Sequence, residues 1–387
     1  MKHSKRIIAL SIAAALAAPL GAQAAVEVYG QARVSVGFIS DDSSATGADD
    51  SSIAVTSHNS RLGFKGAEDL GDGLKAVYQI EAQIDMDDDN TSSVSFTDTN
   101  TTDTDDGSGA TTTTTTTQDT GSGLLIATRN TFVGLAGGFG TVVAGHTDSP
   151  YKTSTGKLDI FADSYADYNA VISTTHDIRP DNIIIYTSPD MSGFTLGVGY
   201  ITDTGNDNLP DTSSTIEKDG FSLAAMYNNK DMGLYATLAY QSLTDWTGTD
   251  NEDATAMKLA VGYTLPTKTA LGLIYENTEV DMTTGTKSDQ DNIYFSVAHP
   301  IAEGTNVKLA IGQRGETASG SNNGGDYLAL GVSKKMTPNA ELYALYAQVS
   351  NDASGSGGIT AGSGPSAGAD KTASAFAVGI NLSFSSQ

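Results

Sequence analysis

Five basic and three acidic residues are the side chains of this sequence best placed to act together on a dissolved molecule. Alternation along the chain puts the five bases on one face of neighbouring strands, and the three acids recur at every fourth residue of one long loop. Bases on one side of a narrow aqueous passage and acids on the other create a transverse field, which orients dipolar solutes and disfavours apolar ones. The bases are Arg33, Arg61, Lys65, Lys75 and Arg129, and the acids are Asp159, Asp163 and Asp167.

Residues 60–85 contain the clearest element that positions such bases. Apolar and polar residues alternate through 61–65 and again through 75–84, around a turn at 66–73 that is rich in glycine and aspartate. Successive side chains leave a strand on opposite sides, so this pattern predicts a hairpin with one apolar face and one charged face.

The same unit repeats along the chain and predicts sixteen strands. Seven short turns and eight longer polar loops join them in strict alternation, which is typical of an outer-membrane barrel with short periplasmic turns and long extracellular loops. An even strand number puts both chain ends on the periplasmic side. The predicted strands cover residues 26–39, 60–65, 75–84, 128–135, 141–145, 183–187, 194–201, 221–227, 234–241, 257–263, 270–276, 293–298, 307–313, 328–334, 342–349 and 376–384.

The strands are expected to close into one cylinder because their apolar face must lie against membrane lipid. Lipid offers no partner to a free backbone amide, so a sheet crosses it only when no edge is left open. A cylinder of about sixteen strands leaves an aqueous channel, whereas eight would be filled by side chains. The predicted fold is therefore an all-β, 16-stranded antiparallel transmembrane β-barrel. A soluble sandwich of the same length is the alternative; it would need the second face of its sheets in water and its strands sorted into stacked sheets.

Residues 147–180 form the third long loop and are predicted to fold inward. The loop combines acids with apolar and aromatic residues, which anchor a loop against a wall, whereas the other loops are mainly serine, threonine, aspartate and glycine. A short helical turn would place its three acids on one side. The apolar residues are Leu158, Ile160, Phe161, Tyr165 and Tyr168.

The start of the chain and its composition limit the location and the partners. Residues 1–24 read as a secretory signal peptide, with a basic start, a short apolar run and the small-x-small end Ala22-Gln23-Ala24, which leaves residues 25–387 as a single barrel domain. The chain has no cysteine and a net charge of −25, so we expect no disulfides and no nucleic-acid partner.

Five segments of the chain resemble the trimeric general porins of Gram-negative outer membranes. The resemblance implies a homotrimer, an inward third loop and wall bases opposite its acids, among them Arg33, Arg61, Lys75 and Arg129. Two departures are Val143 and His146, where such porins often carry bases, and Ser385-Ser386-Gln387 after Phe384, where they usually end in phenylalanine; we interpret these three residues as a frayed extension. The segments are VEVYGQARVSVGF, SRLGFKGAEDLGDGLKAVYQIEAQ, RNTFVGLAGGFGTVVAGHTDSPYK, RPDNIIIYTSPDMSGFTLGVGY and AFAVGINLSF.

The function expected is an outer-membrane channel for passive diffusion of small hydrophilic solutes and ions, without a cofactor. Its expected partners are two further copies of the chain, outer-membrane lipid and lipopolysaccharide, and the barrel-insertion machinery acting on the C-terminal strand. The alternatives are a substrate-specific channel, which needs an aromatic track that a single tryptophan, Trp246, does not supply, and a surface-exposed adhesin or structural barrel.

Enzymatic and metal-binding functions are not favoured by the sequence. The mature histidines His58, His146, His176 and His299 lie in no recognisable catalytic pattern. The aspartate-rich runs at 85–89 and 103–106 lack the glycine and distal glutamate of a calcium-binding EF-hand loop, so we expect no metal site.

Overall fold

The computed structural model describes most of the chain beyond residue 25. Residues 1–25 lie outside the described residues, as do 111–115 of the threonine tract and Trp246, so the signal peptide stays a prediction. The described residues are 26–41, 50–87, 96–98, 116–118, 129–202, 219–245, 252–281, 287–317, 320, 322–355, 357–359 and 366–386.

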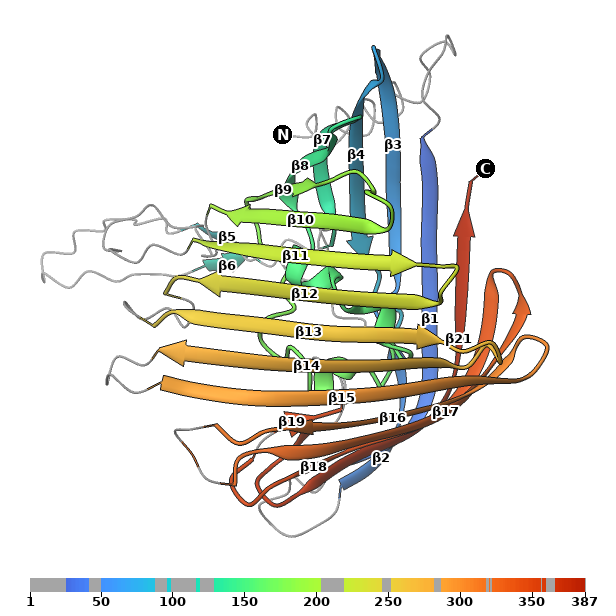
Figure 1. Ribbon diagram of the computed structural model, residues 1–387. Helices are drawn as coiled ribbons and strands as arrows, with labels where there is room; N and C mark the ends of the chain where they lie inside the picture. Colours follow the sequence, from blue (N-terminus) through green and yellow to red (C-terminus); the bar gives the residue numbers. More distant parts are fainter. Residues whose placement is uncertain are drawn as a thin grey trace, which may run out of the picture.

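One antiparallel sheet forms the wall of the molecule. Apart from its second and third strands, which both pair with the first, each of its strands pairs with the next along the chain (Figure 1). The sheet closes because its last strand pairs with its first, from Tyr29↔Ser385 to Asp41↔Ala373. Its strands are β1 (Glu27–Asp41), β2 (Asp50–Ser57), β3 (Arg61–Gly71), β4 (Leu74–Gln83), β7 (Thr131–Gly137), β8 (Gly140–His146), β9 (Ile183–Thr187), β10 (Phe194–Ile201), β11 (Gly220–Asn229), β12 (Leu234–Leu243), β13 (Ala254–Thr264), β14 (Ala270–Asp281), β15 (Lys287–Ala302), β16 (Thr305–Arg314), β17 (Gly325–Thr337), β18 (Ala340–Asn351) and β21 (Thr372–Ser385).

The 17 strands of this sheet occupy sixteen positions around the barrel, which confirms the predicted strand number. Strands β2 and β3 share one position, because one part of β1 pairs with β3 and the other part with β2. The prediction of a loop up to residue 56 was therefore wrong for β2. The apolar–polar alternation of β2 is weak because most of its other residues are serine, threonine or aspartate. Ile53 and Val55 still point outward, with exposed fractions of 76% and 55%.

Apolar side chains cover the outside of the barrel, and small or polar ones line the inside. Leu259 and Val378 are 58% and 54% exposed on the outer face, whereas Ala260 and Ala377 beside them are buried on the inner face. This alternation, apolar out and small or polar in, is what a lipid-facing barrel with an aqueous interior requires.

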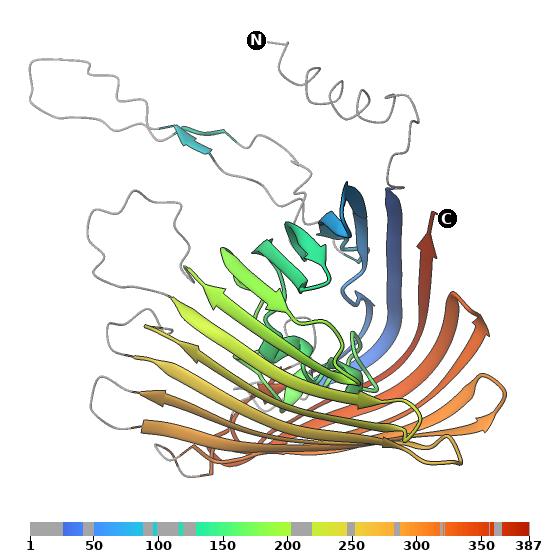
Figure 2. The same cartoon turned by 45° about the horizontal axis from the view of Figure 1, so that its top comes forward.

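The connection from β8 to β9, residues 147–182, turns into the barrel and is called the inner loop below (Figure 2). It contains three short helical segments, α2 (Pro150–Thr153), η1 (Gly156–Leu158) and η2 (Tyr168–Ala170). No helix in the described part of the chain is long and apolar enough to cross a membrane. Two small ribbons lie outside the main sheet, one of β5 (Phe96–Asp98) and β6 (Thr116–Gln118), the other of β19 (Gly357–Gly358) and β20 (Ser366–Ala367).

The predicted apolar anchors of the inner loop pack against the wall formed by β12 to β18 and β21. Leu158, Phe161, Tyr165 and Tyr168 are at most 6% exposed and share one core cluster with inward residues of those strands, and Ile160 packs against it. Two wall glycines leave room for this packing. A Cβ atom at Gly262 would come within 2.6 Å of Leu158 Cδ2, and one at Gly331 within 2.7 Å of Phe161 Cε1.

The C-terminal residues after Phe384 do not all fray. Ser385 belongs to β21, the Ser386 N–H donates to the Val28 carbonyl at 2.8 Å, and the Val28 N–H donates to Ser386 Oγ at 2.8 Å. The predicted frayed extension was therefore wrong for these two serines, which continue the pairing that closes the barrel.

Candidate functional site

A break between β2 and β3 places an asparagine beside the inner loop. Residues 58–60 interrupt this barrel position, and Asn59 adopts a left-handed backbone with φ +54°, which asparagine tolerates better than most residues. Its Nδ2 donates to Asp163 Oδ1 at 2.8 Å, and its Oδ1 accepts from Arg129 Nη1 at 3.4 Å. The sequence pattern did not predict Asn59, because a break in a strand leaves no alternation to read.

Asp163 bridges the inner loop to the barrel wall near the anchor Tyr165, which packs against His58. Its carboxylate forms an ion pair with Arg33, and its Oδ2 lies 3.5 Å from Arg61 Nη2. Arg61 also donates to Gln31 Oε1 at 2.5 Å. The three charged side chains remain 16–19% exposed, so water reaches a cluster in which one carboxylate serves two guanidinium groups.

Arg129 belongs to the same wall but forms its ion pair with a different carboxylate, that of Glu81. It precedes β7 instead of lying within the strand, and its Nε donates to Glu81 Oε1 at 2.8 Å. The second oxygen of Glu81 accepts from the Tyr29 hydroxyl at 2.8 Å. Through Asn59 the two ion-paired groups form one network along the wall, so Glu81 is a further charged member that the sequence analysis did not single out.

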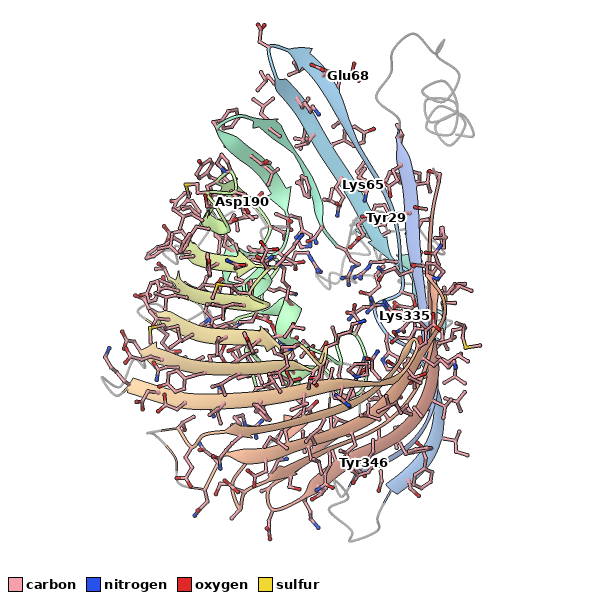
Figure 3. All side chains as sticks on the ribbon, turned by 45° about the vertical axis from the view of Figure 1, so that its right-hand side comes forward. Tyr29, Lys65, Glu68, Asp190, Lys335 and Tyr346 are labelled. Carbon is pink, nitrogen blue, oxygen red and sulfur yellow. The ribbon has the colours of Figure 1, made fainter. Side chains whose placement is uncertain are left out.

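Lys65 and Lys75 lie away from this cluster, toward the short turns. Lys65 pairs with Glu27 at 3.2 Å, and its amine stands 5.0 Å from the centre of the Tyr29 ring (Figure 3). Lys75 is exposed near the start of β4, where it faces Asp69 across the hairpin. The structure therefore brings together three of the five bases that alternation predicts to share one face. Alternation fixes which face of a strand a side chain lies on, but not its height along the barrel axis.

Asp159 and Asp167 hold the inner loop together and do not reach the arginines. No helix runs through residues 159–167, so the predicted helical turn was wrong. Asp159 accepts N–H bonds from Phe161 at 2.9 Å and Tyr168 at 3.3 Å, and Asp167 accepts from Asp163 and Asn169, both at 2.9 Å. Carboxylates that bond nearby backbone amides favour turns over a continuous helix.

The space between the inner loop and the arginine wall is an open cavity of about 580 Å³. Arg61, Arg129 and Asp163 line it, together with charges at the base of the loop. There Asp148 Oδ1 lies 2.9 Å from Arg179 Nη2 and 3.2 Å from Lys152 Nζ. The i,i+4 spacing of Asp148 and Lys152 was a signal in the sequence that these two residues meet.

A family model described as Gram-negative porin matches residues 9–354. The chain belongs to the Gram-negative porin family. As a member of this family it is an outer-membrane β-barrel protein. The porin is 29% identical over 227 residues to the major outer membrane protein P.IB of Neisseria meningitidis serogroup B, an alignment that covers 56% of this chain and 54% of the relative. The chain thus spans about half the length of the curated relatives it matches.

Solved structures share the fold of this porin at low sequence identity. An anion-selective porin from Comamonas acidovorans superimposes with a TM-score of 0.71 at 20% identity, covering 94% of this chain and all of that one. The trimer form of OmpT from Vibrio cholerae gives a TM-score of 0.61 at 18% identity, covering 93% of this chain and 99% of that one.

Two histidines of this porin lie within hydrogen-bond distance of a hydroxyl group in the described residues. At an exposed position His299 Nδ1 lies 2.8 Å from Thr269 Oγ1. Ser35 Oγ and His58 Nε2 are 2.8 Å apart, the spacing of a catalytic pair, but both residues are at most 5% exposed. The Tyr165 ring packs edge-on against His58, with the ring centres 4.8 Å apart, so a solute does not reach this buried pair. Nor does any group of three or more potential metal ligands gather in the described ranges.

The packing of the inner loop should weaken as the pH rises through about 6. Burial raises the pKa of Asp167 from 3.8 to about 6, with the neighbouring carboxylates of Asp163 and Asp177 adding to the shift. A carboxyl group with a raised pKa stabilises the packed loop fully below pH 4, and this contribution is lost as pH passes 6. We therefore expect open-channel current noise to rise between about pH 4 and pH 6 in the wild type and to change less in Asp167→Asn. Noise that falls over this range in the wild type would contradict the assignment.

Proposed function

We propose that this porin forms a water-filled channel through which small hydrophilic solutes and ions diffuse passively across the outer membrane. The observation that carries the proposal is the position of the inner loop: it packs on the wall formed by β12 to β18 and β21 and leaves an open, charge-lined cavity against β3, β4 and the residues before β7. A loop in this position narrows a sixteen-strand barrel without filling it.

Three arginines act in this proposal as the basic wall of the constriction. Arg33 and Arg61 contact Asp163 where the inner loop reaches the wall, and Arg129 joins them through Asn59, so the solute path passes fixed charges of both signs. Lys65 and Lys75 would act on ions as they approach from the periplasm. Asp159 and Asp167 position the loop through its backbone amides. No step in this transport needs a covalent reaction, a cofactor or a metal.

The proposed working unit is a homotrimer in contact with outer-membrane lipid and lipopolysaccharide. The OmpT structure described as a trimer form, which shares this fold, supports the oligomeric state. Lipid would cover the apolar outer face, whose side chains include Leu238 and Leu259. Strand β21, with Phe384 near its end, is the segment offered to the barrel-insertion machinery.

Reconstitution in a planar bilayer tests this function. We expect stepwise insertion events, each closing at high voltage in three equal steps, with a conductance that scales with the salt concentration. A surface adhesin or structural barrel would give no current. A substrate-specific channel would conduct less when one particular sugar is added at millimolar concentration, whereas a general channel would respond alike to sugars of equal size.

A further inference from the structure

A buried lysine and a buried glutamate face each other on the wall behind the inner loop. Lys258 of β13 and Glu276 of β14 are cross-strand partners, and both residues are 0% exposed. Removing a charge from water is costly unless hydrogen bonds and an opposite charge replace the water. The partners that replace it here come largely from the inner loop.

The Lys258 ammonium group is surrounded by loop residues from two separate segments. Its Nζ lies 2.5 Å from Asp177 Oδ1 and donates to Thr155 Oγ1 at 3.2 Å. The centre of the Tyr151 ring is 4.2 Å away, close enough for a cation–π contact. The other oxygen of Asp177 accepts from the Tyr168 hydroxyl at 2.8 Å.

Glu276 makes the complementary contacts from the next strand. Its Oε1 accepts from the Tyr151 hydroxyl at 2.7 Å, and its Oε2 accepts from the Ser173 N–H at 2.7 Å and from Asn292 Nδ2 at 3.1 Å. The Ser173 hydroxyl also donates to this carboxylate. Glu276 therefore contacts both the first and the last part of the loop, as Lys258 does.

We propose that Lys258 and Glu276 form a two-charge latch that holds both ends of the inner loop against the wall and so keeps the constriction in place. The proposal rests on the channel function above and adds the residues that position its loop. Each wall charge is shared between the two loop segments, so releasing either segment leaves a buried charge under-compensated. The loop should accordingly be held or released as one unit. Neither residue touches the solute path, so both are positioning residues.

The latch predicts opposite outcomes for one substitution and for a pair. Lys258→Met keeps most of the side-chain volume but leaves the buried Asp177 carboxylate without its cation, and should release the loop. Lys258→Met combined with Asp177→Asn removes the buried ammonium group together with the carboxylate that it pairs with, and should restore the position of the inner loop. Lys335→Met is the matched control, because Lys335 is an exposed residue of β17 (Figure 3) and takes part in none of the latch contacts given above.

Thiol labelling measures loop release without using conduction. The chain has no cysteine, so Ser164→Cys, a loop position that is 7% exposed, introduces a single probe. In refolded trimers we expect maleimide to react roughly tenfold faster or more with Lys258→Met than with the parent, because an uncompensated buried charge shifts the opening equilibrium. The charge-paired double variant and Lys335→Met should react within about threefold of the parent.

Labelling and bilayer currents together separate the two proposals. Equal labelling rates in Lys258→Met and the parent, with both trimers intact on unheated gels, would overturn the latch. So would a double variant that reacts as fast as the single one. A parent protein that is silent in bilayers would overturn the channel, and the labelling comparison would still decide the latch.

Discussion

Shortening the inner loop should produce the largest change in conductance. Replacing residues 159–167 with two glycines removes Phe161 and Tyr165, which pack on the wall, and Asp163, which crosses to the arginines. We expect single-channel conductance to rise roughly twofold or more, because current through an aqueous pore grows with its narrowest cross-section. The size limit for uncharged sugars in a liposome swelling assay should rise with it.

A deletion of equal length within residues 203–218 is the control for this experiment. That segment joins β10 to β11, and its loss should leave the conductance and the sugar size limit near the wild-type values. Circular dichroism and trimer mobility establish that both variants have folded. Wild-type conductance in a folded, shortened protein would show that the inner loop does not set the width of the channel.

The strands and the inward fold of the loop could be predicted because both depend on local patterns. Period-two alternation marks a strand wherever one face meets lipid, and only apolar loop residues such as Phe161 can anchor a loop inside a barrel. Strand β2 was missed because serine and threonine suit either face, so its alternation rests on Ile53 and Val55 alone.

The contacts of the site could not be predicted from the sequence. They depend on how far along the barrel axis each side chain lies and on which side chains it meets there, and alternation gives neither. Alternation correctly predicted that Lys65 lies on the inner face of the barrel. The pairing of β1 with β3, however, places it opposite Glu27 and away from Asp163. The four-residue spacing of the acids suggested a helix, whereas Asp159 and Asp167 bond their own backbone amides. Asn59 required the break between β2 and β3, which is a feature of the assembled sheet.

Replacing Arg33 and Arg61 together with serine should produce the largest change in ion selectivity. Both guanidinium groups are bound to Asp163, so their loss leaves this carboxylate facing the lumen, with Asn59 as its one remaining hydrogen-bond donor among the described residues. A unit charge about 4 Å from a passing ion is worth about 1 kcal/mol in water, so we expect the cation-to-anion permeability ratio to rise roughly fivefold. The measurement is the reversal potential across a tenfold salt gradient, made at low salt because screening at high salt shortens the reach of exposed charges.

The matched control for this double variant is Lys65→Ser with Lys75→Ser, which removes the same charge from the same wall. These lysines lie toward the short turns and make no ion pair with Asp163, so their loss should shift the reversal potential in the same direction but by less than half as much. Equal shifts in the two double variants would mean that the summed charge of the lumen sets selectivity, and that the Arg33–Asp163–Arg61 cluster is not the constriction. A larger shift in the arginine variant would place the selective step where the inner loop meets the wall, because the two arginines and Asp163 meet at that point.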